Sequence, residues 1–172
     1  MRKEIWTIGH STRGIEEFIA ILEEQRIEIV ADVRQFPGSR RYPHFGRDEL
    51  EKSLAAAQIG YRHFPELGGR RSPQADSPNT AWRNKAFRGY ADYMSSVAFQ
   101  EGIKRLMELA AEKRVAIMCA EADWWRCHRS LIADLLKAEG WRVLHILDEA
   151  KVAEHPFTSA ARIVEGRLSY SA

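Results

Sequence analysis

The sequence has few cysteines, no long hydrophobic run and almost no net charge. Two cysteines in 172 residues are too few for a disulfide scaffold. No apolar stretch approaches the ~18 residues that a membrane-spanning helix needs. The first residues, MRKEIWTIGHS, have neither the apolar core nor the cleavage site of a signal peptide. We therefore expect a cytoplasmic protein with no membrane partner.

The composition and length predict one folded domain over residues 1–172. Hydrophobic residues make up 45% of the chain and charged residues 29%, which excludes wholesale disorder. The net charge is only +2, but residues 62–88 contain six basic and two acidic side chains. This tract is compatible with an anionic ligand and equally with a solvated, mildly basic face.

Short apolar runs alternate with helical periodicity along the chain. The runs predict strands at 4–9, 27–33, 61–64, 115–119 and 142–147. Between them, apolar residues recur at helical spacing in segments 15–22, 48–57, 87–94, 99–110 and 131–136. Such alternation predicts an α/β fold, an open three-layer sandwich with a mostly parallel sheet of four or five strands.

Residues 65–85 interrupt this alternation. The segment contains three prolines and two glycines and has little periodicity. Irregular segments of this length inside a compact domain usually have a function. We expect either a lid loop over the site or a solvated connection.

Polar side chains follow three of the predicted strands. In an open parallel sheet, ligands bind outside the carboxyl ends of the strands. We therefore expect one site at this edge, built from residues that can act as acids, bases, nucleophiles or anion ligands. The candidates are His10, Ser11, Asp32, Arg34, Ser39, Cys119, Glu121, Cys127, His128 and Arg129.

Four motifs carry a resemblance to a known family. TIGHST, DVRQFPGSR, FPELGG and CAEADWWRCHR occur in this order over residues 7–129. Together they resemble the DUF488 family. The resemblance implies a bacterial or archaeal cytosolic protein with a shared polar site. It implies no particular reaction, because the family is defined by sequence.

Arginine provides the main argument for an anionic ligand. Arg34 and Arg129 each present a planar fork of donors that suits a phosphate. Arg129 also lies in the first turn of a predicted helix, where free backbone N–H groups attract anions. Asp32 and Glu121 would supply acid–base chemistry there. The alternative is that Asp32, Glu121 or Asp123 neutralises these arginines within the protein.

The two cysteines and the first histidine have open roles. Cys127, near the start of a predicted helix, would be a reactive thiolate if its pKa were lowered. Cys119 ends an apolar strand and is expected to be buried and inert. His10 would assist as a general acid or base, or be structural. A zinc site from these residues and His128 is disfavoured, since no paired Cys-x2-Cys spacing is present.

These assignments lead to one main hypothesis and two alternatives. The main hypothesis is an enzyme, a hydrolase or transferase, that acts on a phosphate-bearing ligand such as a nucleotide or a nucleic acid. The first alternative is a thiol-dependent or redox enzyme that uses Cys119 and Cys127. The second is a non-catalytic nucleic-acid-binding module that uses the basic tract 62–88. None of the three requires a metal or a cofactor.

Overall fold

The computed structural model describes residues 3–38, 40–69 and 71–172, and within them six strands form one central sheet. The sheet order is β3-β2-β4-β1-β5-β6, in which β6 is antiparallel and all other pairings are parallel. These strands are β1 (Glu4–Gly9), β2 (Ile29–Asp32), β3 (Gly60–His63), β4 (Val115–Cys119), β5 (Arg142–Asp148) and β6 (Lys151–Glu154). The predicted α/β three-layer fold is confirmed.

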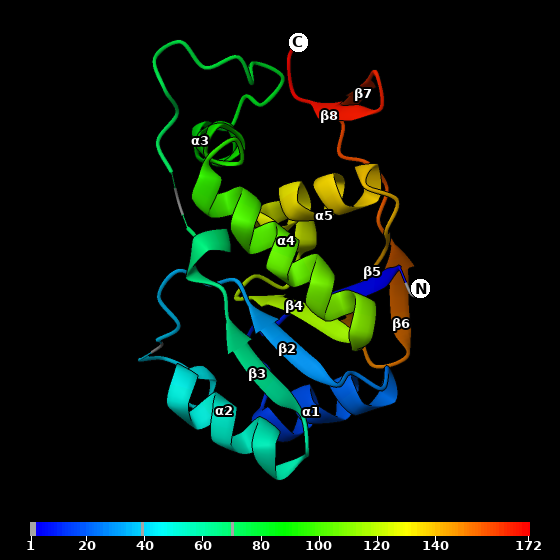
Figure 1. Cartoon of the computed structure of the whole chain (residues 1–172). Coiled ribbons are helices and arrows are strands. Elements are labelled where there is room, and N and C mark those ends of the chain that lie inside the picture. Colours follow the sequence, from blue (N-terminus) through cyan, green and yellow to red (C-terminus); the bar gives the residue numbers. More distant parts are fainter. Residues whose placement is uncertain (1–2, 39, 70) are drawn as a thin grey trace.

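Helices cover both faces of the sheet (Figure 1). α1 (Ile15–Glu24) and α2 (Arg47–Ala56) pack on one face. The other face carries α3 (Lys85–Tyr93), α4 (Val97–Glu112) and α5 (Arg129–Ala138). Among the described residues, no helix combines the length and apolar character needed to cross a membrane.

The central strand β4 separates the two halves of the core. All five of its residues are buried, as expected for a parallel strand covered on both faces. Because side chains alternate along a strand, Ala116 and Met118 pack beneath α1 and α2. Ile117 and Cys119 point the other way, into the core shared with α3, α4 and α5. Cys119 therefore faces the helix that follows Cys127.

Two elements near the C-terminus were not predicted from the sequence. One is β6, and the other is the hairpin of β7 (Arg162–Val164) and β8 (Arg167–Ser169). The residues of β6 and of this hairpin are exposed or only half-buried, so they lack the regular buried–exposed alternation that identifies a strand.

The segment before α3 is irregular, as predicted, but it is held by many contacts. After the short turn η2 (Pro65–Leu67), the described residues 68–69 and 71–84 contain no helix or strand. Asp92 on α3 accepts hydrogen bonds from the Gln74 N–H, the Ser77 hydroxyl and the Asn79 amide. The Ala81 N–H donates to the Tyr170 carbonyl, so the segment lies beside the C-terminal strand end (Figure 1).

Gly9, at the end of β1, allows the loop after β4 to cross directly over it. A Cβ atom at this position would lie only 1.6 Å from the carbonyl oxygen of Glu121. No side chain fits in that space, because the obstructing atoms belong to the backbone. Glycine at this position therefore fixes the path of the loop that leads to the predicted site.

We expect Gly9→Ala to destabilise the fold by about 3 kcal/mol, because the added methyl group must displace backbone. Urea denaturation monitored by circular dichroism measures this. Gly14→Ala is the matched control, since a Cβ there meets nothing within 4 Å and the residue has an ordinary extended backbone. Equal free energies of unfolding for the two variants would contradict the close approach.

Candidate functional site

The carboxyl ends of β1, β2 and β4 are neighbours, and most predicted site residues gather there. The backbone ladder continues past the strands, with the His10 N–H donating to the Cys119 carbonyl and the Val33 N–H donating to the Met118 carbonyl. Two groups of side chains form at this edge, one around Asp32 and one around Cys127. Ser39, also predicted, lies outside the described residues.

Asp32 and Arg34 form a buried ion pair. Asp32 is completely buried, and its carboxylate accepts from Nε and Nη2 of Arg34 at 2.9 and 2.8 Å. It also accepts from the Arg34 backbone N–H at 3.0 Å and from the Tyr61 hydroxyl at 2.5 Å. Burial and the Asp32 charge raise the pKa of Tyr61, so this hydroxyl keeps its proton. The donor fork of Arg34 is therefore occupied within the protein.

His10 is a neutral histidine beside this ion pair. Its Nδ1 lies 2.9 Å from the Ser11 carbonyl, and its ring stacks on Phe45 with centroids 4.4 Å apart. Burial, assisted by the Arg34 charge, lowers the pKa of His10 to about 4. With the proton on Nδ1, Nε2 faces Arg34 Nη1 at 3.4 Å as an acceptor. His10 can therefore accept a proton only in acid solution.

Cys127 lies just before α5, and its sulfur has Cys119, His128 and Arg129 as neighbours. Its residue is 6% exposed, and burial acts to raise the pKa of the thiol. The neighbouring Cys119 thiol, the Arg129 backbone N–H and the Arg129 charge together outweigh burial and lower the pKa of Cys127. Burial and the neighbouring Cys127 raise the pKa of Cys119 well above its usual value. The pKa is therefore lowered at Cys127 and raised at Cys119, whose thiol donates to the Glu121 carbonyl at 3.5 Å.

His128 is oriented toward the same sulfur. Its Nε2 lies 3.0 Å from the Val33 carbonyl, to which it donates, and its Nδ1 lies 3.5 Å from Cys127 Sγ. Burial lowers the pKa of His128, so the ring is neutral. The ring also packs on Tyr90 of α3, with centroids 5.0 Å apart. His128 therefore presents an acceptor to the Cys127 thiol.

Arg129 is a buried cation that is held by neutral groups. It is 1% exposed, and its Nη2 donates to the carbonyls of Glu121 and Ala122 at 2.9 and 3.0 Å. Its Nη1 donates to the hydroxyl of Thr7 at 3.0 Å. In the described part of the chain, Arg129 Nε has no partner and no carboxylate pairs with this guanidinium.

The two carboxylates predicted to supply acid–base chemistry, Asp32 and Glu121, have different environments, since Asp32 is buried in its pair with Arg34. Glu121 is exposed and contributes its backbone carbonyl, not its carboxylate, to the site. Asp123 lies 4.0 Å from Arg126 at the surface. Within the ranges that the structure describes, no group of three or more histidine, cysteine, aspartate or glutamate side chains is placed to hold a metal ion.

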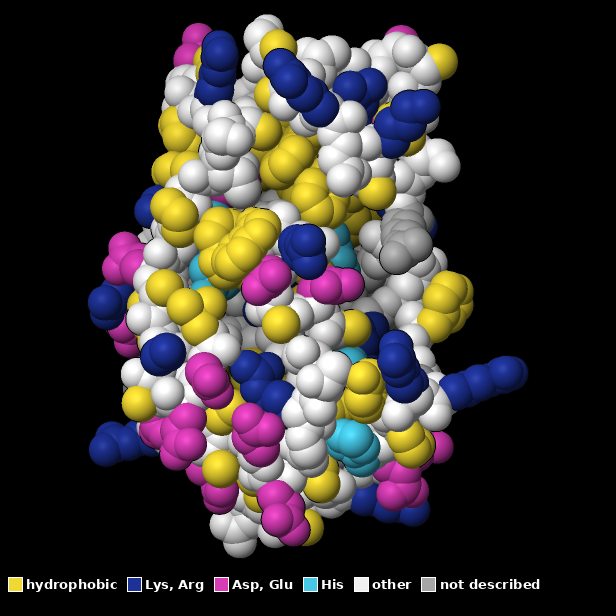
Figure 2. All heavy atoms as spheres, turned by 180° about the vertical axis from the view of Figure 1, so that it is seen from behind, with side chains coloured by type: hydrophobic (Ala, Val, Ile, Leu, Met, Phe, Trp, Pro, Cys, Tyr) yellow, Lys and Arg dark blue, Asp and Glu magenta, His cyan; other side chains and the backbone are white. Residues whose placement is uncertain are grey.

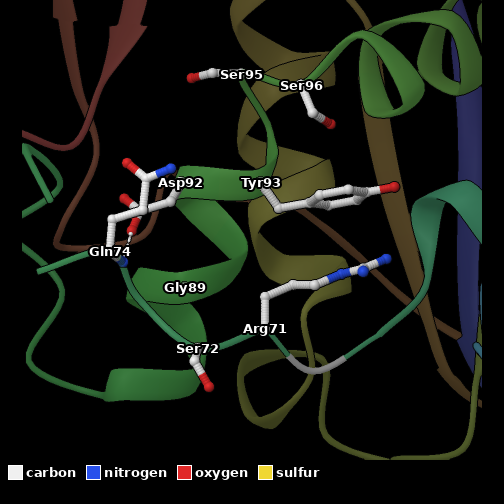
Figure 3. Close-up of a pocket in the computed structure, with 8 residues that line it drawn as sticks. All are labelled: Arg71, Ser72, Gln74, Gly89, Asp92, Tyr93, Ser95 and Ser96. Carbon is white, nitrogen blue, oxygen red and sulfur yellow. Dashed lines mark hydrogen bonds between the residues drawn. The ribbon is translucent and has the colours of Figure 1, made fainter.

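A hollow of about 530 Å³ lies apart from this edge, beside α3, and none of the predicted site residues lines it. Figure 3 shows Arg71 against the ring of Tyr93, with Gln74 bonded to Asp92 on the opposite side. The Arg71 guanidinium covers the Tyr93 ring at 3.8 Å, so this aromatic face is already occupied. We therefore place the candidate site at the sheet edge, where the ionisable groups converge.

One face of the molecule carries mixed charge. In Figure 2, basic side chains are spread over its whole height, and acidic side chains lie between them in the middle and lower parts. Hydrophobic side chains gather in the upper half of this face. This distribution differs from the continuous basic surface expected of a nucleic-acid-binding module.

The sequence did not single out four buried polar residues that hydrogen bonds connect to Arg129: Thr7, Asp134, His145 and His155. Thr7 and His145 lie in predicted strands, Asp134 lies in a predicted helix, and His155 follows the last predicted strand. The available signal was a histidine in the middle of the apolar run RVLHIL, since a buried histidine needs hydrogen-bond partners.

Comparison with known proteins identifies a family but no activity. A family model described as "Domain of unknown function DUF488" matches residues 14–136. No curated protein and no solved structure matches the chain. The matched region contains both cysteines, Arg129 and the Asp32–Arg34 pair, whereas His145 and His155 lie beyond it.

We expect Asp32→Asn to destabilise the protein by about 3 kcal/mol or more, because it leaves the Arg34 guanidinium buried without a counter-charge. Urea denaturation at neutral pH measures the change. Asp123→Asn is the control, and its exposed pairing with Arg126 predicts a change of about 0.5 kcal/mol at most. Similar losses in both variants would show that the buried ion pair is not a major contributor.

The lowered pKa of His10 predicts acid sensitivity. Between the ordinary value of 6.5 and the folded value of about 4, the unfolded chain binds a proton that the folded protein does not. The free energy of unfolding must therefore fall as pH decreases through this window, by up to about 1.4 kcal/mol per pH unit. His10→Gln should make the dependence shallower there and leave it unchanged above the window. An identical slope in the variant would mean that His10 titrates normally.

Proposed function

Because the chain belongs to the DUF488 family, a domain of unknown function, we propose its activity from the chemistry of its own site: a thiol-dependent redox enzyme. Cys127 is the reactive thiolate, and Cys119 is the second thiol. One observation carries this proposal. The Cys127 sulfur lies just before α5, near the buried Arg129 and beside Cys119, and these two neighbours lower its pKa.

Charge balance supports a thiolate at Cys127. A buried guanidinium without an anionic partner is costly, and among the described residues Arg129 has no carboxylate partner. An ionised Cys127 supplies that partner charge. The first turn of α5 adds its N–H groups and its helix dipole, which also favour negative charge. The exposed carboxylate of Glu121 opposes ionisation but is solvated.

The main hypothesis from the sequence, a phosphate held between Arg34 and Arg129, has less support. Arg34 directs its fork at Asp32, and Arg129 directs its Nη donors at carbonyls and at Thr7. A phosphate would have to displace these internal acceptors before either arginine could bind it. The phosphate enzyme and the nucleic-acid-binding module stay predictions.

The proposed substrate is a small hydroperoxide, because a sulfur in a residue only 6% exposed admits only a small reagent. The Cys127 thiolate attacks the terminal oxygen, the O–O bond breaks, and the alkoxide or hydroxide that leaves takes a proton from solvent. Cys127 is then a sulfenic acid. The Cys119 thiol attacks its sulfur, an S–S bond forms, the S–O bond breaks, and water leaves with the Cys119 proton. Two equivalents of an external thiol reduce the disulfide and are themselves oxidised to a disulfide.

Hydrogen peroxide tests the proposal directly. Stoichiometric peroxide should remove two hydrogens from the intact mass, and peptide mapping without reductant should find Cys119 joined to Cys127. Cys119→Ser should stop at a sulfenic acid, seen as the gain of one oxygen in the intact mass, because the second thiol is missing. Cys127→Ser should leave Cys119 unmodified, because the raised pKa keeps Cys119 as a thiol.

Two results would overturn this assignment. One is a folded wild-type protein whose Cys127 survives excess peroxide unchanged. The other is peroxide consumption that Cys127→Ser does not reduce. If, in addition, phosphate raised the melting temperature of the wild type but not of Arg129→Ala, the phosphate-binding hypothesis would be favoured instead.

A further inference from the structure

A buried relay of four polar residues leads away from Arg129, and the proposed reaction does not use it. Thr7 lies on β1, His145 on β5, His155 just after β6, and Asp134 on α5. Each is at most 1% exposed. Buried polar groups are costly unless their donors and acceptors are paired, so each of these four residues needs hydrogen-bond partners inside the protein.

The relay is continuous from Arg129 to Asp134. Thr7 Oγ1 lies 3.0 Å from Arg129 Nη1 and 2.5 Å from His145 Nδ1. His145 Nε2 lies 2.8 Å from His155 Nδ1. His155 Nε2 lies 2.8 Å from Asp134 Oδ1. Four hydrogen bonds thus connect a buried cation on the first residue of α5 to a buried carboxylate farther along the same helix.

The chemistry of the two ends sets the direction of every bond. A guanidinium only donates, so the Thr7 oxygen accepts from Arg129 and its hydroxyl donates to His145 Nδ1. His145 is then protonated on Nε2 and donates to His155 Nδ1. His155 is in turn protonated on Nε2 and donates to Asp134. These directions hold when both rings are neutral, and burial lowers the pKa of His145 to about 2, which keeps that ring neutral.

The far end of the relay is anchored by the C-terminal segment. Asp134 also accepts from the Thr158 N–H and hydroxyl at 3.0 and 2.5 Å, and from the Tyr170 hydroxyl at 2.7 Å. Trp124 stacks on His145, with centroids 4.5 Å apart and planes within 4°. The carboxylate and the ring are thereby held in one orientation each.

We propose that this buried relay is a positioning device for the reactive sulfur, holding the Arg129 guanidinium in one orientation beside Cys127. The inference rests on the proposed function. Thr7 fixes Nη1, and the carbonyls of Glu121 and Ala122 fix Nη2, so the plane of the guanidinium has no freedom to turn. Each hydrogen bond along the relay polarises the next one, which strengthens the hydrogen bond from Arg129 Nη1 to the Thr7 hydroxyl.

The relay acts on a sulfur that other ionisable groups also face. Cys119 and Glu121 approach it from β4 and the following loop, His128 and Arg129 from the start of α5, and Tyr90 from α3. Only Arg129 among them is a cation at neutral pH. A change in the orientation of its guanidinium therefore changes the thiolate fraction of Cys127 without altering any group that touches the sulfur.

Substitution of Thr7 tests the relay. We expect Thr7→Val, which replaces the hydroxyl by a methyl group, to raise the pKa of Cys127 by about one unit. At pH values below that pKa, the thiolate fraction of Cys127 should be about tenfold lower than in the wild type. Thr7→Ser keeps a hydroxyl and should stay close to the wild type. The measurement is the pH dependence of thiolate ultraviolet absorbance, taken as the difference from Cys127→Ser in the same background. This readout does not depend on reagent access.

Nitrogen NMR of the wild-type protein tests the relay independently of any Thr7 variant. At neutral pH, His145 and His155 should both show the neutral ring with the proton on Nε2. If Thr7→Val does not fold, Cys127→Ser gives the same test from the other end. Removing the thiolate should shift the ring signals of His145 more than those of His44, which lies outside the relay.

The failures of the two proposals are distinguishable. A wild-type Cys127 that titrates like a free cysteine overturns the proposed function. A wild-type thiolate that persists unchanged in folded Thr7→Val overturns the relay but leaves the redox function standing. A proton on Nδ1 of either ring, an imidazolium, or His145 signals that Cys127→Ser does not move would also overturn the relay.

Discussion

The burial of the Arg129 cation is the constraint on which the rest of the site depends. A guanidinium that is 1% exposed must satisfy its donors inside the protein, and here it does so with two carbonyls and one hydroxyl. Those carbonyls belong to the loop that crosses over Gly9, and the hydroxyl belongs to Thr7 on β1, the strand that ends at Gly9. The close approach at Gly9 and the arginine therefore support each other. The counter-charge that the carbonyls do not provide is the role we assign to Cys127.

The two arginines at the sheet edge differ because their neighbours differ. Arg34 lies two residues after Asp32, which is near enough for a bidentate pair with a buried carboxylate. That pair is electrically neutral and structural in character. Among the described residues Arg129 has no such carboxylate partner, and its charge acts to lower the pKa of the neighbouring Cys127 thiol. The two arginines that were predicted to hold one phosphate between them therefore have two different environments.

The position of the site follows from the ends of the strands, and the order of the strands in the sheet is enough to predict it. Parallel strands end at one edge, so polar residues after β1, β2 and β4 had to approach one another once these strands were neighbours. Sequence reasoning did not find the partners that act through a third residue. His145 and His155 contact neither sulfur, and they affect the site only through Thr7 and Arg129. Pairwise spacing along the chain contains no information about such a connection.

The sequence by itself determined the alternation of strands and helices, the parallel sheet and the edge at which its polar residues gather, because these follow from local periodicity and handedness. Only the tertiary structure decided which partner each ionisable group has. Asp32 pairs with Arg34, Arg129 pairs with backbone carbonyls, and Cys127 lies beside His128 and Cys119. For the two cysteines, burial and these neighbours shift the pKa in opposite directions, upward for Cys119 and downward for Cys127. Those neighbours are far apart in the chain and meet only when the two halves of the core pack on β4.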